Sequence, residues 1–145
     1  MIPFVRDFDV AYGRRDQASP LIQRVVAVNP GPSTGTGAAT YIVGGSEPGG
    51  SVAVIDPGPA DDAHLAALLD AVAGRTVPHI LVTHTHRDHA PLARPLAAAT
   101  GATILAARPP ARTQHVSDGP DEDDDNDFQP DVILNDGEVI VGEGW

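Results

Sequence analysis

The stretch LVTHTHRDHAP, residues 81–91, decides how this sequence is interpreted, because it gathers metal-ligating side chains at the end of an apolar run. Four such residues fall within six positions, namely His84, His86, Asp88 and His89. Sites in α/β sheets commonly form where a buried strand runs out into a loop. Alternate residues of an extended backbone point to one side, so His84 and His86 can bind one cation. Asp88 and His89 can face a second cation as the chain turns.

The types of side chain in this cluster indicate which metals it would bind. Imidazole and carboxylate donors suit zinc, and they tolerate iron or manganese. Two cations about 3.5–4 Å apart could hold a bridging hydroxide and clamp the reacting oxygen of a substrate. One histidine at a strand end is ordinarily a satisfied polar residue, but four ligand-type residues in six positions favour a metal site. The sequence therefore predicts a pair of zinc ions, with Fe or Mn as alternatives.

Composition limits the other functions open to the chain. Its 145 residues suffice for one domain with a hydrophobic core. The absence of cysteine excludes disulfides, thiolate ligands and a cysteine nucleophile, so any metal must be held by nitrogen and oxygen. A net charge of −11 disfavours broad binding to phosphate backbones. A small-molecule substrate is therefore the favoured partner, and nucleic acid is a weaker expectation.

The chain shows no sign of a membrane or export segment. Charged residues at positions 6, 7 and 9 interrupt the N-terminal region where a signal peptide needs an apolar run. No stretch approaches the roughly 18 apolar residues of a membrane span. The default expectation is a cytoplasmic protein with no membrane partner.

Patterns of apolar residues and turn formers predict an α/β sheet with helices on one face. Residues 1–19 carry no sustained period and are expected to be an extended lead-in. The expected elements, in chain order, are a strand at 21–28, a hairpin of strands at 40–45 and 51–58, a helix at 63–74, a strand at 79–83, a helix at 90–100, a strand at 103–107 and a strand pair at 131–136 and 138–143.

The tract DGPDEDDDND, residues 118–127, is too acidic to pack and is expected to be a solvated loop insertion. It lacks the glycine and the glutamate that an EF-hand loop places at its sixth and twelfth positions. An alternative is an acidic interaction domain in which this tract attracts calcium or a basic partner.

THTHRDH, residues 83–89, is similar to the signature of the metallo-β-lactamase superfamily. The resemblance implies an αββα sandwich with a dinuclear metal site between its sheets. It makes His84 and His86 ligands of the first metal, and Asp88 and His89 ligands of the second. Asp56, in VIDPG, matches an aspartate that supports the metal loop by hydrogen bonds without being a ligand. From the residues alone, an aspartate there could equally be a turn former.

Three longer stretches narrow the resemblance. Residues 29–45, 52–59 and 130–145 look like the N-terminal half of the hydrolase subgroup related to β-lactamase-like protein 2. In that subgroup the Gly/Thr-rich loop lies near the mouth of the metal site. The resemblance therefore makes Thr34, Thr36 and Thr40 candidates for substrate contact, with an ordinary loop role as the alternative.

The chain departs from the superfamily pattern in the later ligands. Members complete the site with another histidine, an aspartate that bridges both metals and a final histidine, all in their C-terminal half. His115 lacks the Pro-Gly-His context of those positions, and His79 and His64 are expected to be structural. We therefore expect residues 1–145 to be a single, truncated metallo-β-lactamase-like domain: the N-terminal half of the sandwich, a mixed sheet with helices on one face.

Two functional hypotheses follow from these observations. The first is a metal-dependent hydrolase in which a metal-bound hydroxide attacks an ester, thioester, amide or phosphodiester, and Asp88 also orients that hydroxide. The second is a non-catalytic metal-binding fragment or a dimerising half-domain, because a half-built sandwich leaves apolar sheet surface exposed. In the second case the chain is expected to bind a second copy of itself and form a homodimer.

Overall fold

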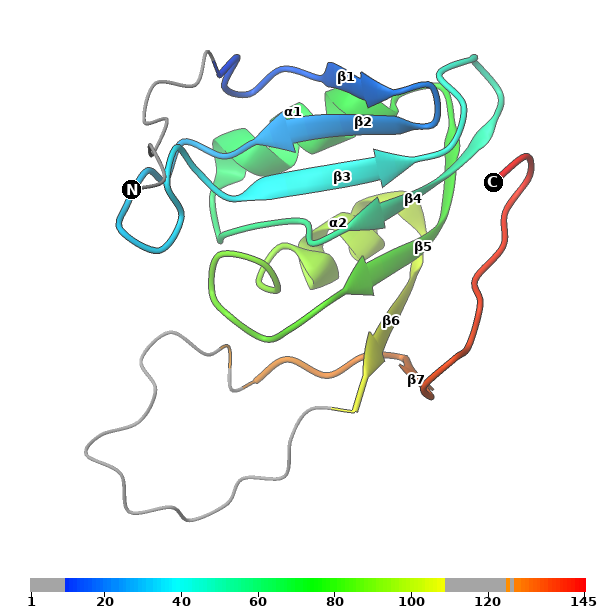
Figure 1. The fold of residues 1–145 in the computed structure, drawn as a ribbon. Helices are drawn as coiled ribbons and strands as arrows, with labels where there is room; N and C mark the ends of the chain where they lie inside the picture. The colour runs from blue at the N-terminus through cyan, green and yellow to red at the C-terminus, as the bar shows by residue number, and fades with distance from the viewer. Residues whose placement is uncertain (1–9, 109–124, 126) are drawn as a thin grey trace, which may run out of the picture.

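The computed structural model describes residues 10–108, 125 and 127–145. In this part of the chain two helices cover one face of a mixed seven-stranded sheet, as Figure 1 shows. The predicted fold class, a mixed sheet with helices on one face, is therefore confirmed. His115 and most of the predicted acidic insertion lie outside the described residues.

The sheet contains its strands in the order in which they follow one another along the chain. The strands are β1 (Asp16–Ser19), β2 (Ile22–Val26), β3 (Ala39–Val43), β4 (Ser51–Ile55), β5 (Thr76–Val82), β6 (Thr103–Ala107) and β7 (Val132–Leu134). From β1 to β4 neighbouring strands pair antiparallel, as hairpins permit, and from β4 to β7 they pair parallel. Helices form the crossovers from β4 to β5 and from β5 to β6 (Figure 1).

Both predicted helices form, and their ends have local causes. Helix α1 (Asp62–Val72) begins where the Asp61 carboxylate accepts hydrogen bonds from the next amides, at 2.8 and 3.3 Å. Helix α2 (Ala93–Thr100) ends at Gly101, which adopts the left-handed conformation with φ 79°. It begins three residues later than expected, because the chain is still turning through residues 87–92.

The hydrophobic core lies between the helices and the sheet. Its centre contains few aromatic residues, in keeping with a composition that is 4% aromatic. Gln23, Thr40 and His64 are polar residues buried with it. The large aliphatic side chains that are fully buried are Val25, Ile42, Val52, Val54, Leu68, Ile80, Leu96 and Ile104.

Two sequence predictions are wrong. The expected lead-in contains a strand, β1, which pairs with β2 although its sequence DQAS has no apolar alternation. The expected strand at 138–143 does not form, and Val139 and Val141 are 80% and 72% exposed. Within the described residues no surface buries these valines, and a two-stranded ribbon without such burial is marginal in water.

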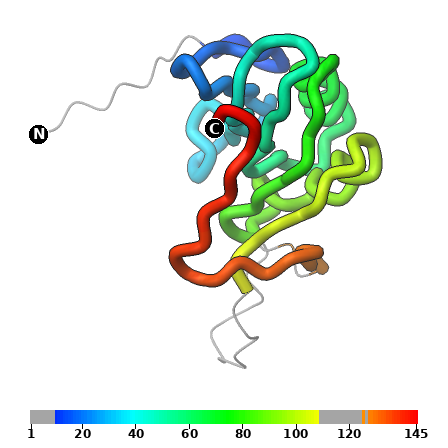
Figure 2. Tube along the Cα trace, turned by 90° about the vertical axis from the view of Figure 1, so that its right-hand side faces the viewer, coloured from blue at the N-terminus to red at the C-terminus, as the bar shows by residue number. Residues whose placement is uncertain are grey.

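The segment after β7 instead runs back along the molecule to the C-terminus, as Figure 2 shows. There the indole N–H of Trp145 donates to the carbonyl of Ser51, at 3.0 Å, at the start of β4. Among the described residues, no helix has the length and apolar character needed to cross a membrane.

His64 gives the fold a measurable dependence on pH. Burial lowers the pKa of this histidine below its usual 6.5, so below about pH 6.5 the unfolded chain binds a proton that the folded chain does not. The free energy of unfolding is therefore expected to fall as the pH falls from 7.5 to 5.5. His64→Gln should make this fall smaller in urea unfolding at the two pH values. An unchanged pH dependence in the variant would contradict the prediction.

Candidate metal centre

The loop that follows β5 brings the predicted ligands together. The ring centroids of His84 and His89 lie 4.2 Å apart, and those of His84 and His86 lie 4.6 Å apart. Asp88 lies beside them, with Oδ2 3.2 Å from Nε2 of His89. Three imidazoles and a carboxylate therefore converge within one short loop.

Backbone hydrogen bonds fix the shape of this loop. The N–H groups of His89 and Ala90 both donate to the carbonyl of His86, at 2.9 and 3.1 Å. The loop is joined to the turn after β4 because Gly58 N–H donates to the carbonyl of His89 at 3.0 Å. The carbonyl of Gly58 in turn accepts from Leu92 N–H, at 3.3 Å. Two loops from neighbouring strands thus form one hydrogen-bonded unit.

Asp56 lies at the centre of this unit, directly after β4. Its Oδ1 accepts from the Thr83 amide at 2.8 Å, and its Oδ2 accepts from the Thr83 hydroxyl at 2.7 Å. The same Oδ2 lies 3.1 Å from Nδ1 of His89. Asp56 is 8% exposed and has φ 50°, a conformation that L-residues adopt at a cost. Its carboxylate therefore ties the end of β4 to the metal loop.

These contacts also determine which ring nitrogens remain available to a metal. An ionised carboxylate only accepts hydrogen bonds, so His89 donates from Nδ1 to Asp56, while its Nε2 faces the Asp88 carboxylate 3.2 Å away. The Thr83 hydroxyl gives its proton to Asp56 and must accept from Nδ1 of His84, 2.8 Å away. In both rings Nδ1 is therefore engaged by the supporting residues, and Nε2 is the nitrogen through which a cation could be bound.

Donor atoms of Asp56, His84 and His89 all lie within 4.8 Å of one another, so these three could hold a cation. Both oxygens of Asp56, however, already accept hydrogen bonds from Thr83 or His89. This favours Asp56 as a support for the ligands over Asp56 as a ligand. The assignment of His84, His86, Asp88 and His89 as metal ligands stays a prediction. The nitrogen and oxygen donors present fit zinc.

The surroundings of His84 favour its neutral form. Partial burial, followed by the proximity of His89 and His86, lowers the pKa of His84 below its usual value. A histidine must be neutral to bind a metal, so a lowered pKa keeps His84 competent for binding at lower pH.

The cluster opens into a pocket of about 490 Å³. Its far wall comes from the Gly/Thr-rich loop, where the Thr34 hydroxyl donates to the carbonyl of Asn29 at 2.6 Å. Of the three threonines proposed for substrate contact, Thr34 lines this pocket, but Thr40 is buried in the core against His64. Thr36 accepts from the Tyr12 hydroxyl through its carbonyl. The pocket is lined by Asn29, Ser33, Thr34, Pro59, His84, His86, Arg87, Asp88 and His89.

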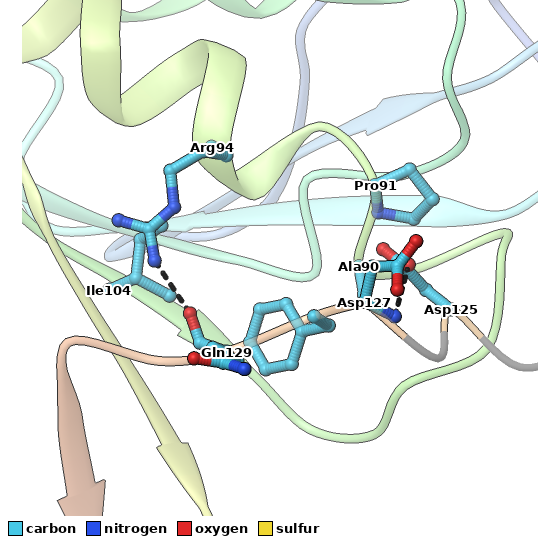
Figure 3. A pocket seen from close by; sticks show the side chains of 8 residues that line it. Ala90, Pro91, Arg94, Ile104, Asp125, Asp127 and Gln129 are labelled. Atoms are coloured by element: carbon cyan, nitrogen blue, oxygen red, sulfur yellow. Dashed lines mark hydrogen bonds between the residues drawn. The ribbon is translucent and has the colours of Figure 1, made fainter.

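A second hollow of about 250 Å³ lies beside the metal loop, between α2 and the segment that precedes β7 (Figure 3). Arg94 on α2 closes one side, donating to the carbonyl of Gln129 at 2.6 Å and to the Asp131 carboxylate at 2.7 Å. At the other side Asp125 N–H donates to the carbonyl of Thr85 at 2.6 Å. The end of the acidic tract therefore contacts the metal loop.

Sequence reasoning missed Thr83 and Asn29. Thr83 follows the strand as an ordinary β-former, and its hydroxyl acquires a role only because Asp56 lies beside it across β4 and β5. Asn29 resembles a turn residue, and its Oδ1 accepts from the Ala38 amide at 2.8 Å to close the Gly/Thr-rich loop. Among the described residues, His64 on α1 and His79 on β5 are the histidines outside the cluster, and neither lines this pocket.

The fold is of the α/β class, with a candidate metal site of nitrogen and oxygen donors at the ends of parallel strands. A family model described as the metallo-beta-lactamase superfamily matches residues 33–145. That match covers more than half of the sequence, and the chain belongs to this superfamily.

Two solved structures resemble the chain. BJP-1, a subclass B3 metallo-beta-lactamase of Bradyrhizobium japonicum, is 20% identical, with a TM-score of 0.58 over 92% of this chain and 50% of that one. A metallo-beta-lactamase from Cronobacter sakazakii with a HARLDQ motif is 23% identical, with a TM-score of 0.47 over 66% of this chain and 35% of that one. The first likeness supports the fold. The chain spans half or less of the length of these structures.

Proposed function

We propose that this chain is part of a metal-dependent hydrolase with a small-molecule substrate. The observation that supports this most directly is the pair His84 and His89, whose Nδ1 atoms are held by Thr83 and Asp56, with Nε2 of His89 turned toward the Asp88 carboxylate. Rings that serve only to pack have no need for a buried carboxylate that sets their tautomer.

Divalent cations bound here would lower the pKa of a water molecule and polarise the bond to be hydrolysed. The residues of the chain position the reactants. His84, His86 and His89 would supply nitrogen donors to the metal, and the Asp88 carboxylate can accept a hydrogen bond from the attacking water and orient it. Asn29 and Thr34 form a preorganised wall on the other side of the pocket, since their hydrogen bonds are made within the loop.

Zinc is the proposed metal, with two ions in a complete site and iron or manganese as alternatives. We propose that further ligands come from outside these 145 residues, which is supported by the coverage of 50% of BJP-1. The likeness to the subgroup related to β-lactamase-like protein 2 remains a prediction from sequence, as does the cytoplasm as the compartment. The substrate bond is proposed to be an ester, thioester, amide or phosphodiester.

The proposal is tested by measuring whether hydrolysis depends on a bound metal. The longer protein that would supply the further ligands is purified and assayed with a p-nitrophenyl ester, a thioester, a β-lactam and bis(p-nitrophenyl) phosphate, before and after removal of metal by a chelator. We expect hydrolysis of at least one substrate to be lost with the chelator and regained with zinc. His84→Ala should show none of the zinc-dependent rate. Equal rates with and without metal on every substrate would contradict a hydrolase.

The alternative is a non-catalytic metal-binding half-domain that dimerises. One observation favours it: apolar side chains remain exposed on β3 and after β7, including Tyr41 at 39% and Val141 at 72%. A dimer in sedimentation analysis, binding zinc but hydrolysing none of the substrates, would support this alternative over the hydrolase.

A further inference from the structure

The imidazole of His64 is buried directly beneath the turn that carries Asp56. His64 is 3% exposed, and its Nε2 lies 3.0 Å from the Thr40 hydroxyl, which is itself fully buried. Its Nδ1 is buried without a hydrogen-bond partner. A buried polar atom left unpaired costs free energy, so a purely apolar side chain would fill this position at lower cost.

The contact between His64 and Gly58 is unusually close. A Cβ atom added to Gly58 would lie 2.8 Å from both Cδ2 and Nε2 of His64, and Gly58 has φ 98°. The backbone of the turn therefore lies against the Cδ2–Nε2 bond of the ring with no room for a side chain between them. Gly58 can approach in this way because it has no side chain.

The same glycine joins the turn to the metal loop. Its N–H donates to the carbonyl of His89 at 3.0 Å, and its carbonyl accepts from Leu92 N–H at 3.3 Å. Two residues earlier, Asp56 holds Nδ1 of His89 at 3.1 Å. The position of the His64 ring is thus linked to His89 through the backbone of one turn.

We propose that His64 is a positioning residue of the metal centre, whose ring supports the turn from Asp56 to Gly58 and thereby holds His89 in its ligand position. This inference rests on the proposed function only in taking His89 as a ligand. The Thr40 hydroxyl holds Nε2 of the ring, so the support extends from β3 through α1 to the turn after β4.

Zinc titration and amide exchange test the proposal together. His64→Ala removes the support and is expected to weaken zinc binding about tenfold or more, the effect usual for residues that orient ligands. It should also speed hydrogen exchange of the Gly58 and Leu92 amides relative to the Ile80 amide in the core. His64→Gln, whose amide can replace Nε2 beside Thr40, should restore most of the zinc affinity and the protection.

Val72→Ala is the matched control. Val72 lies on the same helix and is 4% exposed, but it belongs to the far end of α1 from His64. The control should lower the free energy of unfolding while zinc affinity and the relative exchange of Gly58 remain as in the wild type. If His64→Ala folds and resembles this control in both measurements, the positioning role is wrong.

A second arm covers the case in which His64→Ala does not fold. Gly58→Ala is introduced into the wild type and into His64→Gln. The backbone cost at φ 98° is the same in both, but the flexible glutamine can move away from the new methyl group. The loss of zinc affinity should therefore be at least about threefold smaller in the His64→Gln background. Equal losses would overturn the proposal.

The measurements also separate this proposal from the proposed function. If the wild type binds no zinc, the metal centre on which the proposed function rests fails for these 145 residues. Exchange of the Gly58 amide in metal-free protein then still decides whether His64 supports the turn. If the wild type binds zinc and the variants show no selective effect, only the positioning role fails.

Discussion

Replacing His84 by alanine is expected to weaken zinc binding by about a hundredfold or more. The free energy of binding to a protein zinc site is shared among few ligands, so removal of one is worth several kcal/mol. His84 is also the ring nearest to both other histidines of the cluster, at 4.2 and 4.6 Å between centroids. Isothermal titration of chelator-treated protein with zinc, at a pH near 7.5, measures the change.

His79→Gln is the matched control for this variant. It removes an imidazole from β5, the strand that leads to the cluster, at a position that does not line the pocket. Zinc affinity close to that of the wild type is expected. If His84→Ala bound zinc as tightly as the wild type, the cluster after β5 would not be the metal site.

The second large effect is expected for Asp56→Asn, which affects both stability and metal binding. The Asp56 carboxylate accepts from the Thr83 amide, the Thr83 hydroxyl and Nδ1 of His89. An asparagine in either orientation turns its NH₂ group toward at least one of these donors. We expect the free energy of unfolding to fall by about 1–3 kcal/mol. Zinc affinity should fall about 10–100-fold, because the ring of His89 loses the acceptor that orients it.

Asp70→Asn provides the comparison for Asp56→Asn. Asp70 is an exposed aspartate on α1, so the substitution makes the same change of charge without a buried acceptor. Urea unfolding and zinc titration should both resemble the wild type. Wild-type zinc affinity in Asp56→Asn would show that the carboxylate acts only as a turn former, the alternative that the sequence left open.

Much of the fold followed from local patterns. The apolar run before the histidines, the N-cap at Asp61 and the stop at Gly101 act over a few residues, and the structure contains the elements they predict. Strand β1 was missed because DQAS carries no strand signal, and its pairing with β2 comes from the neighbouring strand. Residues 138–143 alternate as a strand does, but alternation yields a strand only where one face is buried.

The sequence by itself determined the kind of chemistry: four metal-ligating side chains in six positions, nitrogen and oxygen donors only, at the end of a buried strand. Only the tertiary structure decided how those donors are held. The parallel pairing of β4 with β5 places Asp56 beside Thr83 and His89, 27 and 33 positions away in the chain. The tautomers of the histidines and the support from His64 depend on that pairing. Hydrogen bonds act over about 3 Å in space, and sequence spacing does not specify which distant residues reach that distance.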